Sequence, residues 1–456
     1  MDASMNYVLT ITQQAKELGV SVFDEGGRLV SYVSREFDEP HPDELLSAVI
    51  TLIDGALRHA GITSDDLTAI GMAASCFTIV GWDGISGQPL GSFQTPTLWS
   101  SFSAEQKATY VIEEVKRLAS SMDMSLVNVR LGGLHTWFLW NLSQGRSYKI
   151  DDAHDLMAID SDDDMETEMS WHSLCGLSST MFPTSVAEPG ELAHVSSVYL
   201  NGSRTIISAL TSIPVAGLIG SGITASGKAF INYGQDGFVV MRIPQKPLSV
   251  HSELSIRKAR LGMFYEDEWI ALARFSFAQT LLVWMKTIQP TFAEVAQTPL
   301  GLMSDPSIIV TPFLDHGVEK AAIIGIDADT SFNAIHTAAL RSMAYAASEA
   351  LETMQHNFTK SLDMLCVERS GFAVPALFWF QAGISTTVVV ERERDAYARG
   401  TAILTGIGAK LWTLSQGIKR FEEHVTSHRY DSPEGGSRMK LQRKRWQKTY
   451  LDFLHL

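Results

Sequence analysis

The feature that most constrains the fold of this chain is that a strand-rich segment followed by helical segments occurs twice along the sequence. Tyr7 to Ile11, Gly19 to Asp24 and Arg28 to Val33 have the composition and alternation of short strands in a β-meander. A second strand-rich start follows near residue 227, where Lys228 to Tyr233 and Phe238 to Ile243 flank a candidate hairpin turn. Helical patterns come after each start. The sequence therefore predicts an α/β protein with two similar halves and a cleft between them.

The segments after each start have recognisable periods. Apolar residues recur at helical spacing from Leu45 to Leu57, and Gly61 marks the end of that helix. Ile70 to Trp82 reads as one buried strand, followed by a turn at Asp83 to Gly87. Ser331 to Met354 predicts a long, alanine-rich helix.

Net charge and cysteine content narrow the function classes. The 456 residues carry a formal net charge of −15, which disfavours binding to nucleic acid and to anionic membranes. The three cysteines lie far apart, unlike those of a disulfide scaffold. No continuous apolar run reaches the roughly 20 residues of a membrane span, and no signal peptide is indicated. We expect a cytoplasmic protein.

Two charged segments have simple interpretations. Residues 151–169 are rich in acids, but the sixth and twelfth positions of a calcium loop would hold Met165 and Trp171 instead of Gly and Glu. We expect a solvated loop and no bound metal. Lys440 to Lys448 is basic and predicts a surface helix at the C-terminus.

Several ordered segments resemble the FGGY family of carbohydrate kinases, especially its gluconate-kinase-like branch. They are the opening meander, the stretch Ala74 to Phe77 with Gly87 to Leu90, and three later landmarks: Gly220-Ser-Gly222, Thr311 to Leu314 and Ala398-Arg-Gly400. The resemblance implies two actin-like domains, residues 1–226 and 227–456, flanking a central cleft where sugar and ATP meet. It also implies a hinge that closes on substrate.

The family's phosphate-binding turn is Asp-x-Gly-Thr, and here its three positions fall on Thr12, Gln14 and Ala15. A side chain at the glycine position restricts the close approach of backbone to phosphate. Loss of the acid removes a charge that could order a metal. Lys16 follows and is expected to be a solvated side chain.

The family's catalytic base is an Asp whose position falls on Ile213 in the gluconate-kinase pattern or on Ser221 in the glycerol-kinase pattern. No Asp or Glu occurs from Ser203 to Ile231, so a small shift of the alignment cannot restore it. The Trp-x-Asp-x-Arg of the sugar-side loop is replaced by Pro96, Leu98 and Ser100. On the nucleotide side, the adenine-facing glycine pair falls near Arg369 and Ser370, and the phosphate-contacting Gly-Thr resembles Gly234-Gln235.

Few residues offer replacement chemistry. Asp236, Asp315 and His316 are the candidate catalytic groups, although Asp236 is also a natural turn former in Gln-Asp-Gly. Cleft positions that match family motifs also include Ser75, Cys76 and Phe77. Cys76 is interpreted as a buried strand residue rather than a nucleophile. Trp137 and Trp140 are interpreted as core residues of a helix.

These substitutions lead to the hypothesis of an FGGY homologue that has lost kinase catalysis and binds a small molecule or a protein partner. The first alternative is an ATP-dependent kinase for a sugar acid or polyol with a non-standard active site, and the second is an enzyme of different chemistry in the same cleft. The leading hypothesis expects no cofactor, whereas the kinase alternative requires Mg-ATP. The expected ligand is a sugar or polyol, and a homodimer is compatible with the sequence.

Overall fold

The structure is a computed structural model that describes most of the 456 residues. The described residues are 6–14, 16–37, 41–97, 99–121, 125–151, 153–156, 177–183, 185–200, 204–234, 236–245, 254–259, 269–275, 279–288, 307–315, 318–358, 362–368, 374–392, 395–431 and 436–454.

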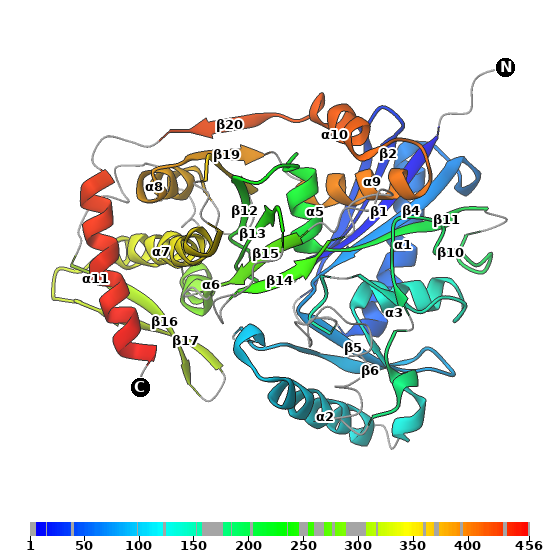
Figure 1. The fold of residues 1–456 in the computed structure, drawn as a ribbon, viewed down its shortest axis with the longest axis horizontal. Helices are drawn as coiled ribbons and strands as arrows, with labels where there is room; N and C mark the ends of the chain where they lie inside the picture. The colour runs from blue at the N-terminus through cyan, green and yellow to red at the C-terminus, as the bar shows by residue number, and fades with distance from the viewer. Residues whose placement is uncertain are drawn as a thin grey trace.

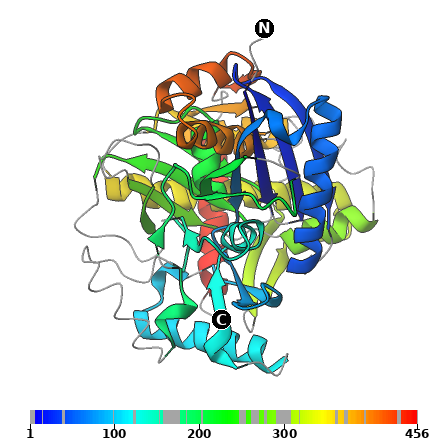
Figure 2. The same cartoon turned by 90° about the vertical axis from the view of Figure 1, so that its right-hand side faces the viewer.

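The first large sheet contains the predicted meander. Its order is β10-β11-β4-β1-β2-β3; β1, β2 and β3 are antiparallel neighbours, and β4 and β11 continue the sheet in parallel. The strands are β1 (Tyr7–Gln14), β2 (Glu17–Asp24), β3 (Leu29–Glu36), β4 (Leu67–Ala74), β10 (Ala193–His194) and β11 (Ile206–Ser212). Helix α1 (Pro42–Ala60) packs along β2 and β3 and ends at Gly61, whose φ is 69° (Figures 1 and 2). The predicted meander and helix are confirmed.

The second large sheet repeats this plan. Its order is β14-β15-β13-β12-β18-β19-β20; β12, β13 and β15 are antiparallel neighbours, and β18 and β19 are parallel additions. The strands are β12 (Lys228–Asn232), β13 (Phe238–Ile243), β14 (Ser255–Lys258), β15 (Trp269–Arg274), β18 (Met364–Glu368), β19 (Val388–Arg392) and β20 (Ser427–Tyr430). Apart from its edge strand β14, the second sheet has the strand order of the first, so the predicted repetition is confirmed at the level of topology. We call each large sheet with the helices that cover it a lobe.

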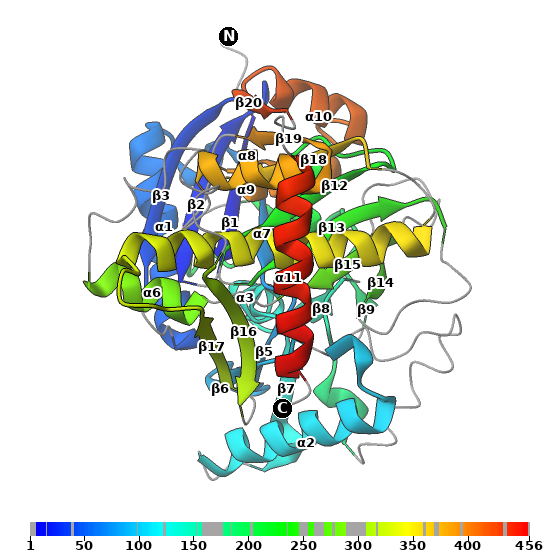
Figure 3. The ribbon, with the colours of Figure 1, turned by 90° about the vertical axis from the view of Figure 1, so that its left-hand side faces the viewer.

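In the second lobe, helices cover the sheet on the side that faces away from the first lobe. Helix α7 (Phe332–Phe358) contains the predicted alanine-rich segment, and α11 (Gly436–Leu454) contains the predicted basic one. Figure 3 shows α11 crossing α7 on this outer side. The neighbouring elements are α6 (Gln279–Ile288), α8 (Pro375–Ser385) and the hairpin of β16 (Ile309–Asp315) with β17 (Val318–Ile324).

Two helices lie between the lobes. Helix α5 (Ile213–Gly220) packs against α9 (Ala396–Gly408), and α9 also packs against β1, β4 and β11 of the first lobe. An apolar cluster that includes Phe23, Ile213, Phe238 and Ile403 fills the space between the sheets. Helix α10 (Leu414–Glu422) follows α9. A domain boundary at residue 226 remains a prediction, and α9 comes from the later half of the chain yet packs on the first sheet.

One predicted strand is wrong. Ile70 to Trp82 forms two strands, β4 and β5 (Thr78–Asp83), separated by a turn at Ser75 to Phe77. Strand β5 belongs to a smaller sheet with β6 (Pro89–Gln94) and β7 (Val129–Gly132), which α2 (Ala104–Ser121) covers. The sequence pattern gives no sign of the turn, because both strands and the turn between them are almost wholly buried.

The acidic segment is also corrected in part. Asp151 and Asp155 are buried, with 5% and 1% of their surface exposed, so the start of this segment is not a solvated loop. Asp151 pairs with His135 of α3 (Leu134–Leu142), with 2.8 Å between Asp151 Oδ2 and His135 Nε2. Residues 157–176, the greater part of the segment, lie outside the described residues. Trp137 is fully buried in α3, as predicted.

The remaining short elements connect these parts. They are β8 (Lys149–Ile150), β9 (Ser185–Val186) and the 3-10 turns η1 (Ser64–Asp66), η2 (Trp99–Ser101), η3 (Leu126–Asn128) and η4 (Ser179–Met181).

Candidate functional site

A cavity of about 510 Å³ opens beside the ends of β1 and β4, and the second lobe reaches it through the β12–β13 hairpin. Polar and charged residues form much of its lining, including Gln13, Lys16, Ser75, Gln94, Arg117 and Asp236. Its volume is within the usual range for a small-molecule site.

Asp236 is the lining residue that the hairpin contributes. Ser75 Oγ lies 3.4 Å from its Oδ2, although the two residues are 161 positions apart in the chain. Asn232 Nδ2 donates to the Asp236 carbonyl oxygen at 2.8 Å, and Gly234 N donates to Asn232 Oδ1 at 3.0 Å, so the turn is held by its own hydrogen bonds. Asp236 therefore lies in the turn that the sequence predicts, and its role as a catalytic group remains a prediction.

Burial and two neighbouring groups act on the pKa of the Asp236 carboxyl. Burial raises its pKa above the ordinary value, and the nearby charge of Arg274 and the hydrogen bond with Ser75 oppose that rise. A carboxylate with a raised pKa, partly exposed to a cavity, can accept a proton from a bound hydroxyl.

The two positions that resemble the family's base are apolar or inaccessible. Ile213 begins α5 with 5% of its surface exposed and packs in the apolar cluster with Cys76, Phe77 and Phe238. Ser221 lies at the C-terminal end of α5 with 2% exposed. Neither position lines the cavity. Cys76 is buried as predicted, in a turn instead of a strand, and burial raises the pKa of its thiol.

The phosphate-turn positions lie at the end of β1. Thr12 is buried opposite Gly19, and Gln14 is half-buried opposite Glu17. Gln13 lines the cavity instead, because successive side chains of a strand point to opposite faces. Lys16 is exposed, as expected for a solvated side chain, but it also lines the cavity.

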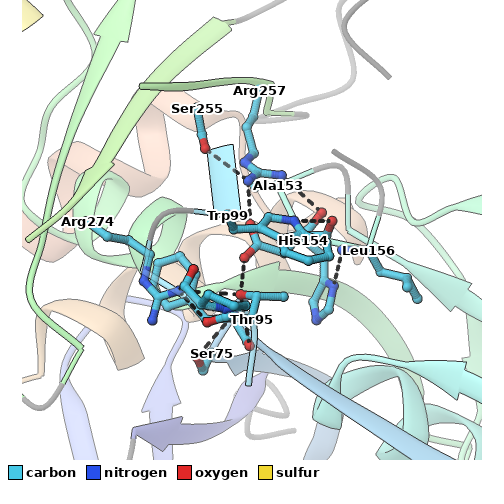
Figure 4. A network of polar contacts seen from close by, with 12 residues as sticks. Ser75, Thr95, Trp99, Ala153, His154, Leu156, Ser255, Arg257 and Arg274 are labelled. Atoms are coloured by element: carbon cyan, nitrogen blue, oxygen red, sulfur yellow. Dashed lines mark hydrogen bonds and ion pairs between the residues drawn. The ribbon is translucent and has the colours of Figure 1, made fainter. Parts of the chain in front are cut away.

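Two arginines of the second lobe, Arg257 and Arg274, contact residues of the first lobe, as Figure 4 shows. Arg257 of β14 forms a buried ion pair with Asp155 and donates to the His154 carbonyl oxygen at 3.2 Å. Arg274 of β15 donates from Nη1 to the carbonyl oxygens of Thr95 and Pro96, at 2.8 and 3.0 Å. Thr95 Oγ1 in turn donates to the Asp155 carboxylate.

Sequence reasoning missed Gln13, Asp155, Arg257 and Arg274. The available signal was a charged residue in or at the end of an otherwise apolar strand, as in Trp269-Ile-Ala-Leu-Ala-Arg274. Such a residue needs a partner when it is buried, but the strand pattern does not identify the partner.

Other candidates cannot be placed around the cavity. Leu98, Gln235, Arg369, Ser370, Ala15 and His316 lie outside the described residues. Asp315 is the last residue of β16. Pro96 and Ser100 are half-buried, and Pro96 contributes the carbonyl group bound by Arg274.

Two further observations concern possible ligands. Among the described residues, no three His, Cys, Asp or Glu side chains are grouped to hold a metal ion. A Mg²⁺ ion that arrives with a nucleotide needs only one or two protein carboxylates, because it retains waters and phosphate oxygens. A Mg²⁺ ion held by phosphate oxygens and waters would leave the Asp236 carboxylate, the one acid of the lining, available to a bound hydroxyl. No helix in the described part of the chain is long and apolar enough to cross a bilayer.

Comparison with known proteins gives glycerol kinases that align with most of the chain. No family model matches the sequence. A glycerol kinase of Enterococcus casseliflavus is 23% identical over 472 aligned positions, which cover 92% of each chain.

Solved structures agree with this relationship. The Plasmodium falciparum glycerol kinase with ADP superposes with a TM-score of 0.75 at 17% identity, covering 99% of this chain and 98% of that one. The gluconate kinase of Lactobacillus acidophilus superposes with a TM-score of 0.71 at 14% identity, covering 98% and 97%. The expected pair of actin-like domains is thus confirmed as the fold. The chain is therefore similar to glycerol kinases over most of its length, and it has the fold of glycerol and gluconate kinases, as its resemblance to FGGY carbohydrate kinases implies.

Proposed function

We propose that this chain is an ATP-dependent kinase for a sugar acid or polyol, and that Asp236 replaces the missing base of the family. The observation that carries this proposal is the Asp236 carboxylate on the cavity wall, with Ser75 Oγ at 3.4 Å and a pKa raised by burial. The family relationship supports phosphoryl transfer as the reaction class.

The proposed step is a transfer between two oxygens. The acceptor hydroxyl loses its proton to the Asp236 carboxylate, its oxygen bonds to the γ-phosphorus of ATP, and the bond from that phosphorus to the bridging oxygen breaks to release ADP. A base is most effective when its pKa approaches the working pH, so the rise in the Asp236 pKa is in the useful direction. Bound Mg²⁺ would supply charge neutralisation on the phosphates.

The charges around the cavity favour an anionic acceptor. Lys16 and Arg117 line the cavity, whereas Asp236 is the one acid among its lining residues. A carboxylate on the acceptor is attracted to these cations, although Glu114 already pairs with Arg117 at 2.6 Å. We therefore favour a sugar acid over a neutral polyol, with the ligands meeting between domains of residues 1–226 and 227–456.

The second candidate is binding without transfer, as the substituted motifs led us to expect. The packing of Ile213 against Phe77 and Phe238 favours it, because apolar side chains occupy the place where the family has its base. In that case the cavity would bind its ligand, and Asp236 would have only a structural role in the hairpin.

The test is a panel of sugar acids and polyols with Mg-ATP, measuring both ADP release and the shift in melting temperature. We expect one or more acceptors to give ADP and phosphorylated product. Asp236→Asn should lower that rate by a factor on the order of 10² to 10⁴, while both ligands still raise the melting temperature. The control is Asp327→Asn, which changes an exposed acid in the turn before α7.

The possible results distinguish the kinase from the binding protein. Stabilisation by a sugar acid without any ADP release would identify a binding protein and reject the kinase proposal. Transfer that survives Asp236→Asn would keep the kinase and reject Asp236 as its base.

A further inference from the structure

Arg274 is the cation that connects the second lobe with two segments of the first. It ends β15, opposite Phe238 of β13. Its Nη1 donates to the carbonyl oxygens of Thr95 and Pro96 at 2.8 and 3.0 Å. Its guanidinium carbon lies 4.1 Å from the centre of the Phe77 ring, a cation–π contact. One side chain thus fixes both the turn after β4 and the loop that begins at Thr95.

These two segments contribute to the lining of the cavity that contains Asp236. Ser75, in the same turn as Phe77, is within 3.4 Å of the Asp236 carboxylate. The Thr95 loop follows Gln94, which lines the cavity. A displacement of Arg274 would therefore move two segments that line the same cavity as Asp236.

We infer that Arg274 is a positioning residue for the proposed transfer: it fixes the Thr95 loop and the Ser75 turn beside the cavity, and its positive charge acts on the Asp236 carboxyl. The inference rests on the proposed function. No sequence motif indicates this role, since Arg274 simply follows five apolar residues of a strand.

The effect of the Arg274 charge on Asp236 can be distinguished from the effect of its hydrogen bonds. Burial raises the pKa of Asp236, the positive charge of Arg274 and the hydrogen bond from Ser75 lower it, and the negative charge of Asp155 raises it. Lys16, from the turn after β1, lines the same cavity. Arg257 also joins the lobes, but its charge is directed to Asp155, with which it pairs.

The experiment compares two variants, one that keeps a hydrogen-bond donor without the charge and one that keeps the charge without the planar guanidinium. Arg274→Gln keeps a donor for the Thr95 and Pro96 carbonyls and removes the charge, whereas Arg274→Lys keeps the charge and loses the planar fork. We expect the glutamine variant to need a higher pH for half-maximal transfer, because Asp236 then titrates at higher pH. The lysine variant should retain the wild-type pH profile and raise the acceptor KM.

A readout independent of activity accompanies this comparison. The chemical shift of the Asp236 carboxyl carbon, followed against pH in ¹³C-aspartate-labelled protein, should move its midpoint to higher pH in Arg274→Gln and remain near the wild-type midpoint in Arg274→Lys. Arg257→Lys is the control for a lobe-joining arginine and should leave the midpoint unchanged.

Unchanged midpoints and pH profiles in Arg274→Gln would overturn the inference and leave Arg274 with a purely structural role. If the wild-type chain transfers no phosphate, the proposed kinase function fails, and the carboxyl titration still decides whether Arg274 controls Asp236. If Arg274→Gln does not fold, a midpoint raised in Phe77→Leu, which removes the ring beneath the guanidinium, supports the inference, and an unchanged one contradicts it.

Discussion

At the level of single residues, the His154 ring is held neutral because both of its nitrogens have partners. Leu156 N donates to Nδ1 at 3.1 Å, so Nε2 carries the proton and donates to the Thr78 carbonyl oxygen at 3.1 Å. Burial lowers the pKa of His154 to about 4 from the ordinary 6.5. The proton must therefore be taken up mainly on unfolding.

This imidazole should make the folded state sensitive to acid. Between pH 6.5 and 4 the unfolded chain binds the His154 proton and the folded chain does not, so stability falls as pH falls. The loss across this window is about 3 kcal/mol, at roughly 1.4 kcal/mol per pKa unit. Urea unfolding of wild type and His154→Gln at pH 7 and pH 4.5 measures it. The variant should lose less stability on acidification, and an equal loss in both proteins would contradict the assignment.

Lys16 gives a second prediction for a single residue. If it attracts the carboxylate of a sugar-acid acceptor, Lys16→Gln should raise the KM for that acceptor by about two- to fivefold, the effect expected of an exposed charge pair. The KM for a neutral polyol should not change. Lys444→Gln, on the exposed face of α11, is the control and should affect neither acceptor. An equal change in KM for the sugar acid and the polyol would show that Lys16 does not distinguish acceptors by their charge.

At the level of elements, the pair α5–α9 depends on glycines that allow close approach. A Cβ at Gly400 of α9 would overlap the Ala216 carbonyl oxygen of α5, and one at Gly220 would overlap the Ala396 carbonyl oxygen. Backbone atoms cannot move aside as a flexible side chain can, so a methyl group at either site forces the helices apart. This packing gives a physical reason for two of the glycines that carry the family resemblance.

Gly400→Ala should therefore destabilise the fold by about 2 kcal/mol or more, despite the better helix propensity of alanine. The matched control is Gly55→Ala in α1, where a Cβ meets no atom within 4 Å. That change should stabilise the protein by roughly 0.5–1 kcal/mol. Thermal or urea unfolding of the two variants compares them directly, and a neutral Gly400→Ala would mean that α5 and α9 do not pack this closely.

At the level of the whole molecule, the buried pair of Arg257 and Asp155 joins the lobes, with 2% of each side chain exposed. Removing one partner leaves the charge of the other buried and unpaired. Arg257→Met should cost about 3–5 kcal/mol, and the double variant Arg257→Met with Asp155→Leu should cost less than the sum of the single changes. A double-mutant cycle from urea unfolding measures this coupling. Strict additivity of the two changes would show that the pair does not join the lobes energetically.

The sequence by itself determined the repeated plan of the chain. The period of two in the meanders and the period near 3.6 in Leu45 to Leu57 and Ser331 to Met354 report which face of each element is buried, and the structure confirms these elements. Periodicity failed at Ile70 to Trp82, because a turn buried between two buried strands has no polar signal. The absence of acids from Ser203 to Ile231 could also be read directly.

Only the tertiary structure decided which side chains share the cavity. Asp236 and Ser75 are 161 positions apart, and Arg274 and Thr95 are 179 apart. Local patterns fix the faces of strands and helices, but they do not specify which loop ends meet after the sheets pack. The family motifs pointed to Thr12 and Gln14, whereas strand alternation places Gln13 on the cavity wall. A candidate site built from a hairpin acid and a strand-end arginine therefore became visible only once both lobes were in place.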